Sequence, residues 1–133
     1  MAAEITDRAR ELLSAPNFAH VATLREDGHI HGVLVWVDVE DDRVVLNSAE
    51  GRAWPNNVQR DPRISLTVPN GENPYETVNI RGRVVEVTNE DADDHIDAMA
   101  MKYLGQDSYP FRQEGEVRVK IVVEPESVSV QGG

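Results

Sequence analysis

The sequence predicts a mainly β protein, an antiparallel β-barrel with a few helices, built as one domain from residues 1–133. Six short apolar segments of strand length are separated by turn residues, whereas only two segments have clear helical periodicity. A chain of 133 residues is long enough for one hydrophobic core and leaves little room for a second. Many antiparallel strands with few helices in one domain are typical of a small barrel.

The N-terminal part is expected to form a helix followed by a three-stranded meander. The helix covers residues 4–13, and its apolar face consists of Ile5, Ala9, Leu12 and Leu13. The first turn between strands, Glu26-Asp27-Gly28, contains an Asp-Gly pair, which is the strongest short-range hairpin signal in the chain. The three strands cover residues 18–25, 29–39 and 43–47.

The remainder of the chain is expected to add three strands and a second helix. The helix, residues 89–104, is capped by Thr88 or Asn89 and ends at Gly105. Its apolar face consists of Ile96, Met99, Ala100, Tyr103 and Leu104. The strand period slips near Gly82, which predicts a bulge or a close backbone approach there. The strands cover residues 64–68, 76–87 and 117–123, the first broken by the Pro-containing segment 69–74 and the last ending at the Glu-Pro-Glu corner 124–126.

Composition argues against several classes of function. The formal net charge of -11 argues against nucleic acid, because a phosphate backbone requires a basic face. Without cysteine the chain has no disulfide, thiolate metal site or cysteine nucleophile. No apolar run approaches the roughly 20 residues of a membrane-spanning helix, and the charged N-terminus lacks the apolar block of a signal peptide. We therefore expect a soluble, cytoplasmic protein with no nucleic-acid or membrane partner.

The segment from Asn47 to Arg63, between two apolar strands, is the first candidate binding site. It concentrates positive charge in an acidic chain, with Arg52, Arg60 and Arg63 against only Glu50 and Asp61. A polar turn that leads into a short helix suits a phosphate, because backbone N–H groups, the helix dipole and guanidinium groups all attract an anion. A plain connector whose arginines pair with nearby acids explains the same residues equally well.

Ordered motifs along nearly the whole chain resemble a known family. They are Phe18-Ala-His-Val-Ala-Thr-Leu, Val35-Trp-Val, Gly51-Arg-Ala-Trp, Arg60-Asp-Pro-Arg-Ile-Ser-Leu, Ile80-Arg-Gly-Arg-Val, Asp94-His-Ile-Asp and Lys102-Tyr-Leu-Gly. Together they resemble the flavin/deazaflavin split-barrel oxidoreductases related to pyridoxamine-phosphate oxidase, and most of all the branch that uses the deazaflavin coenzyme F420. The resemblance implies a six-stranded antiparallel split barrel of the FMN-binding type. It also implies a homodimer with cofactor clefts at the subunit interface.

The resemblance further implies which residues hold the cofactor. The ring would rest against the strand that contains Val35 and Trp36. The phosphate tail would lie on Asn47, Ser48, Arg52, Ala53 and Asn57. Trp54 replaces a second cation that many relatives have, so it either packs under the helix or lines the mouth of the cleft. Arg60 could supply the missing positive charge.

The implied function is hydride transfer from reduced F420 to an electrophilic small molecule such as an enone, a quinone or a tetrapyrrole-like acceptor. The alternatives are an FMN-binding oxidoreductase or flavin carrier of the same fold, and a non-catalytic F420-binding protein. The acidic C-terminal segment has no Arg or His, which argues against pyridoxamine-phosphate oxidation. The cofactor itself performs hydride transfer, so no catalytic residue is assigned. His31 is a candidate proton donor, and His29 with His31 has no third acidic ligand for a metal.

Overall fold

The computed structural model describes residues 2–132, whose strands form one antiparallel sheet of seven strands in the order β2-β1-β5-β6-β7-β4-β3. The strands are β1 Phe18–Leu24, β2 Ile30–Trp36, β3 Asp38–Glu40, β4 Arg43–Ala49, β5 Arg63–Asn70, β6 Asn73–Thr88 and β7 Arg118–Gln131. The helices are α1 Asp7–Ser14, α2 Ala53–Arg60 and α3 Ala92–Leu104. The predicted mainly β, antiparallel class is confirmed, with seven strands rather than six.

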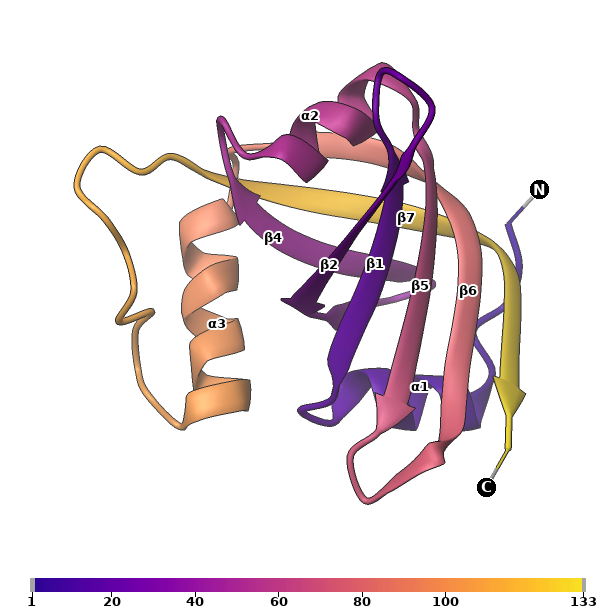
Figure 1. Cartoon of the computed structure of the whole chain (residues 1–133). Helices are drawn as coiled ribbons and strands as arrows, with labels where there is room; N and C mark the ends of the chain where they lie inside the picture. The colour runs from indigo at the N-terminus through magenta and orange to yellow at the C-terminus, as the bar shows by residue number, and fades with distance from the viewer. Residues whose placement is uncertain (1, 133) are drawn as a thin grey trace.

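The sheet curls around one core, and the helices lie at its ends and side. In Figure 1, α2 lies over the upper end of the curled sheet, α1 lies over the lower end, and α3 stands outside it beside β4. The predicted apolar face enters the core through Ala9, Leu12 and Leu13 of α1 and through Ile5, which lies just before the helix because α1 begins at Asp7 rather than at residue 4; none of the four is more than 3% exposed. The Thr6 hydroxyl caps this helix by accepting a hydrogen bond from the Ala9 N–H.

The expected single strand 29–39 is wrong, because the chain bends at Val37 and continues as the separate strand β3. β2 and β3 are the two end strands of the sheet, although only Val37 separates them in the sequence. Val37 is buried, and its backbone groups bond to α3. The Val37 N–H donates to the Tyr103 hydroxyl (3.0 Å), and its carbonyl oxygen accepts from Lys102 Nζ (2.6 Å) and lies 3.1 Å from the Tyr103 hydroxyl oxygen. Side chains of α3 thus satisfy the backbone at the point where the barrel is split.

The predicted irregularity at Gly82 is confirmed. The register between β6 and β7 shifts at Arg81/Gly82, opposite Pro125. A Cβ atom on Gly82 would lie 2.4 Å from the Glu124 carbonyl oxygen, so the two backbones approach too closely for any other residue. The expectation that the last strand ends at the corner containing Pro125 is wrong. Pro125 sits at the bulge, where a missing N–H costs no ladder hydrogen bond, and β7 continues to Gln131.

Two further boundaries differ from the sequence expectation. The segment 69–74 is mostly strand, because β5 and β6 join in a tight turn whose Gly71 N–H donates to the Asn17 side chain. Helix α3 begins at Ala92, after Asp91 in the left-handed conformation, and neither Thr88 nor Asn89 is its N-cap. Its buried face includes His95 and ends with a half-buried Tyr103, while Leu104 is exposed. Gly105 ends the helix in the left-handed conformation, as predicted.

Candidate functional site

A pocket of about 220 Å³ lies between β2, β4 and α3, beside the loop that joins α3 to β7. Its lining combines aromatic and aliphatic side chains with two arginines and one amide. The lining residues are Phe18, Leu34, Val35, Trp36, Asn47, Arg52, Ile96, Met99, Tyr109, Phe111 and Arg118. An apolar pocket with a few convergent polar groups is the usual form of a small-molecule site.

Aromatic rings form one wall of this pocket. The Trp36 indole stacks on the Tyr103 ring, with centroids 5.0 Å apart and planes 6° apart, and it meets the edge of Tyr109 at 5.9 Å. Tyr109 in turn makes an edge contact of 5.7 Å with Phe111. The Tyr103 hydroxyl is fixed because it donates to the Asn17 carbonyl oxygen (2.6 Å) at the bend beside Val37. The wall is therefore held in place by Tyr103, whose hydroxyl also bonds to the backbone at the bend between β2 and β3, the seam of the split barrel.

Arg118 forms the charged base of the pocket and is only 4% exposed. Its Nε donates to Asn47 Oδ1 (3.0 Å), its Nη1 donates to Glu116 Oε1 (3.1 Å), and its guanidinium lies over the Tyr109 ring at 5.0 Å. Burial lowers the pKa of Arg118, and the neighbouring Glu116 carboxylate opposes that shift. A buried guanidinium needs such partners, because an unpaired buried charge is costly.

Arg52 lies at the rim of the same pocket and precedes the first turn of α2. Its side chain is half exposed, and its Nη2 lies 3.3 Å from Glu116 Oε1. One carboxylate oxygen therefore faces both arginines. The predicted anion clamp at Arg52 thus lies beside a second, buried arginine that sequence reasoning did not single out.

Asn47 supports Arg118, and both the nitrogen and the oxygen of its side-chain amide form hydrogen bonds. Its nitrogen donates to the Ala92 carbonyl oxygen (2.9 Å) and to His95 Nδ1 (3.0 Å), while its oxygen accepts from Arg118. Burial lowers the pKa of His95, so this ring is neutral at pH 7, with its proton on Nε2. Asn47 therefore connects β4, α3 and β7 at the base of the pocket and orients Arg118.

The structure brings four of the sequence-predicted site residues together in this pocket, namely Val35, Trp36, Asn47 and Arg52. The others lie elsewhere. Ser48 and Trp54 are buried in the barrel, at 1% and 3% exposed. Asn57 donates to the Thr23 hydroxyl inside the barrel (3.1 Å), Arg60 donates to the Leu24 carbonyl oxygen, and Ala53 is exposed at the start of α2. Of the two alternatives for Trp54, the packed position under the helix is the one observed.

His29 and His31 do not line this pocket. His31 Nδ1 is 2.8 Å from Arg25 Nη2 at the hairpin end of β2, five residues before Trp36 and hence roughly 16 Å along the strand. His29 pairs with Asp27 in the hairpin turn. Within residues 2–132, no group of three or more histidine or acidic side chains is arranged to hold a metal ion.

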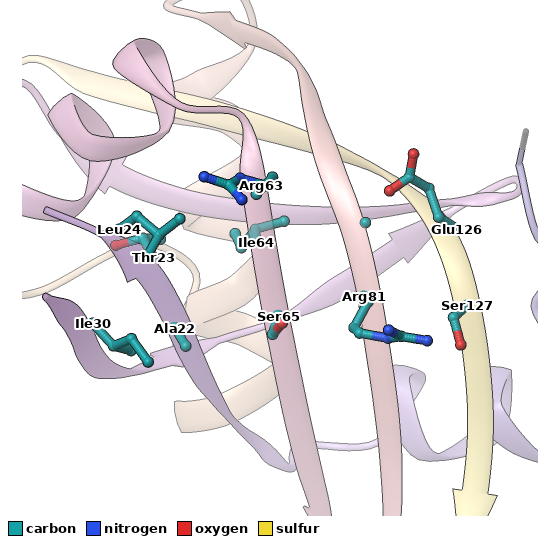
Figure 2. Close-up of a pocket in the computed structure, with 11 residues that line it drawn as sticks. Ala22, Thr23, Leu24, Ile30, Arg63, Ile64, Ser65, Arg81, Glu126 and Ser127 are labelled. Carbon is teal, nitrogen blue, oxygen red and sulfur yellow. The ribbon is translucent and has the colours of Figure 1, made fainter. Parts of the chain in front are cut away.

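A larger groove, of about 450 Å³, lies on the outer face of the sheet. Figure 2 shows Ala22, Ser65 and Ser127 along its floor, with the Arg63 and Arg81 side chains beside them. Arg63 is already paired with Asp61 through two contacts, at 2.7 and 3.0 Å. This groove has no aromatic ring in its lining, so we place the candidate site in the smaller pocket, where rings and guanidinium groups converge.

Sequence reasoning did not single out Arg118 or Glu116 as members of the site, and it left Tyr109 open between a packed position and a place in the cleft. Arg118 follows the alternation Val-Arg-Val-Lys, which places it on one strand face without indicating that α3 covers this face. Glu116 and Tyr109 lie in the loop after α3, where no periodic pattern constrains position. The one sequence signal for this pairing is the excess of acidic residues, which makes a carboxylate partner available for a buried arginine.

Comparisons with known proteins agree with this architecture. The family model for pyridoxamine 5'-phosphate oxidase matches residues 5–132 of the chain. A solved structure named F420 reductase is 24% identical over 90% of this chain and 94% of that chain, with a TM-score of 0.79. A conserved hypothetical protein from Mycobacterium tuberculosis is 17% identical over 98% of this chain and 86% of that chain, with a TM-score of 0.75.

A putative pyridoxamine 5'-phosphate oxidase from Listeria innocua is 14% identical over 93% of this chain and 95% of that chain, with a TM-score of 0.68. At these identities the likenesses to solved structures show the fold alone. No curated protein matches the chain. Among the described residues, no helix is long and apolar enough to span a bilayer.

Proposed function

This chain belongs to the pyridoxamine 5'-phosphate oxidase family and has its split-barrel fold, and on that premise we propose that it is an F420-dependent reductase. The reduced deazaflavin would pass a hydride to an electrophilic small molecule such as an enone or a quinone. Family membership supports an oxidoreductase with a flavin or deazaflavin cofactor. The choice of F420 rests on the sequence motifs and on the pocket described above, and FMN is the second candidate.

The observation that carries the proposal is the meeting of an aromatic wall with two guanidinium groups in one pocket. A flat tricyclic ring packs favourably against aromatic faces such as Trp36 and Tyr109. An anionic tail pairs with Arg52 and Arg118, which are local positive charges in a chain of net charge -11. The residues present therefore fit such a cofactor.

The chain's own residues have a limited task in this chemistry. When bound, the cofactor supplies the hydride. The protein must orient the ring, exclude water from one face, and hold the acceptor about 3–3.5 Å from the reacting carbon. Trp36, fixed by Tyr103, would set the ring plane, and the loop with Tyr109 and Phe111 would cover one side. Arg52 would bind the phosphate far from the reacting atoms.

The protein is proposed to act as a homodimer with the cofactor cleft at the subunit interface. β2 is an end strand that pairs only with β1 among the described strands, and it exposes apolar side chains. Phe18, Ile30 and Leu34 are 49%, 73% and 54% exposed. Phe18 and Leu34 also line the pocket, so a second copy of the chain seated on them would complete its open side.

A spectral titration of purified apo-protein with F420 and with FMN tests the proposed function. We expect tighter binding of F420, and oxidation of the reduced complex when an enone or quinone is added. Saturable FMN binding without F420 binding would favour the second candidate. Binding of F420 with no transfer to any electrophilic acceptor would indicate a cofactor-binding protein rather than a reductase.

A further inference from the structure

Glu116 occupies the space between the two arginines of the pocket. Its Oε1 accepts from Arg118 Nη1 at 3.1 Å and lies 3.3 Å from Arg52 Nη2. The Glu116 side chain is only 7% exposed and the Arg118 side chain only 2% exposed. The carboxylate therefore lies where an anionic group of a ligand would have to lie in order to contact both guanidinium groups.

Glu116 is an incomplete partner for these arginines. One oxygen is shared by two guanidinium groups, while Oε2 is buried with no hydrogen-bond partner in the described chain. A carboxylate pairs best with an arginine when both oxygens accept in parallel, and a buried acceptor without a donor loses its hydration. A phosphate offers three oxygens and could accept from both arginines at once. Replacement of Glu116 by such a group is therefore chemically favourable.

We propose that Arg52 and Arg118 form one binding site for a phosphate or carboxylate group, and that Glu116 fills this site in the empty protein and leaves it when the ligand anion enters. This inference deepens the proposed function and rests on it for the identity of the ligand, which would be the acidic tail of the cofactor. The site itself is defined by residues of this chain alone.

The surroundings allow such an exchange. Arg118 is held by Asn47 and by the Tyr109 ring, so it stays in place when Glu116 moves. Arg52 is half exposed, so a ligand reaches it from solvent. Glu116 lies at the end of the exposed loop after α3 and follows Gly115, which has φ +77°. The carboxylate therefore belongs to a surface segment, whereas both arginines flank regular elements.

The test compares Glu116→Gln with Glu114→Gln. Both changes remove one negative charge from the same loop, but Glu114 is exposed. Pyrophosphate binding is measured by calorimetry and F420 binding by spectral titration. Glu116→Gln should bind both about tenfold more tightly than the wild type, because a neutral amide competes less well for the arginines. Glu114→Gln should stay within about twofold, and Arg52→Ala should abolish the gain in the double variant.

Each outcome decides a different point. A Glu116→Gln protein that binds pyrophosphate no more tightly than Glu114→Gln overturns the inference, and so does a gain that persists in full without Arg52. A gain for pyrophosphate with no binding of F420 or FMN supports the anion site and rejects the proposed function. Tight F420 binding with the same affinity in the wild type and in Glu116→Gln supports the proposed function and rejects this role of Glu116.

Discussion

Arg52 and Arg118 reach the same pocket but differ in what they contribute to the protein. Arg118 is buried and bonded to Asn47 and Glu116, so its removal would leave the Asn47 amide oxygen without its donor and the buried Glu116 carboxylate with Arg52 alone. Arg52 is half exposed and meets Glu116 at 3.3 Å, a contact that contributes little to stability. Arg52 is therefore the residue whose substitution separates binding from folding.

We expect Arg52→Ala to lower F420 affinity roughly ten- to a hundredfold, because a charge-assisted pair is worth on the order of 1.5–3 kcal/mol. Turnover at saturating cofactor should change far less, since a phosphate remote from the reacting carbon contributes mainly uniform binding. Titration and steady-state kinetics of the same preparation give the two quantities.

Arg63→Ala is the matched control, because Arg63 pairs with Asp61 and lies in the groove outside the pocket. Its affinity should equal that of the wild type. Equal losses for the two variants would mean that a diffuse positive field attracts the cofactor. An unchanged affinity for Arg52→Ala would remove the phosphate clamp from the proposed function.

At the scale of elements, the pairing of β6 with β7 depends on Gly82. A methyl group there would lie 2.4 Å from the Glu124 carbonyl oxygen, so the strands would have to separate. We expect Gly82→Ala to cost about 1–3 kcal/mol of unfolding free energy, as overpacking usually does. Gly32→Ala, also on a strand, meets nothing within 4 Å in its own chain and should cost less unfolding free energy than Gly82→Ala. Chemical denaturation of both variants checks this, and equal stabilities would contradict it.

Lys102 makes the attachment of α3 sensitive to pH. Burial lowers the pKa of Lys102 to about 8 from 10.5, with Asp38 opposing the shift. Between pH 8 and 10.5 the unfolded chain thus binds more protons at this group, so its contribution to stability rises with pH, by at most about 1.4 kcal/mol per pH unit. The raised pKa of Tyr103, about 12, acts in the opposite direction only above pH 10.

The unfolding free energy of Lys102→Met, measured by denaturation at several pH values below 10, should therefore rise less steeply with pH than that of the wild type. Lys120→Met is the control, because Lys120 of β7 pairs with Glu40 of β3. Its unfolding free energy should rise with pH as steeply as that of the wild type. A wild-type stability that does not rise between pH 8 and 9.5 relative to Lys102→Met would contradict the burial of a charged ammonium group at this seam.

The elements that the sequence predicted well are those with their own local signal. A few neighbouring residues are enough to indicate the conformation at each of these places, namely the Asp-Gly turn, the apolar face of α1, Gly82 and Gly105. The bend at Val37 has no such signal, because its cause lies at Lys102 and Tyr103, more than sixty residues away. The site follows the same rule, since Trp36 and Arg52 belong to recognisable motifs, whereas Arg118 and Glu116 acquire a role only when β7 and its preceding loop fold against β4.

At the scale of the whole molecule, the exposed apolar side chains of β1 and β2 predict a dimer. A standard interface covers about 800 Å² per partner, roughly a tenth of the 7421 Å² that this chain exposes. We expect sedimentation to show a dimer at micromolar concentration and Leu34→Glu to shift it toward monomer, since a charge would be buried against the partner.

Met101→Glu provides the comparison for the dimer, because Met101 is 48% exposed on α3 and does not line the pocket. It should leave the sedimentation of the wild type unchanged. A wild-type monomer at micromolar concentration would count against the shared cleft, and a dimer insensitive to Leu34→Glu would mean that another face makes the contact.

The bend at Val37 has a consequence for how the protein opens. Among the described residues, the Val37 N–H donates to the Tyr103 hydroxyl and to no neighbouring strand, so we expect its exchange with deuterated water to follow a movement of the last turn of α3 while the sheet stays intact. The same movement unstacks Trp36 from Tyr103. One backbone amide therefore reports how often the aromatic wall of the pocket comes apart, and a ligand that packs on Trp36 would slow the exchange of that hydrogen.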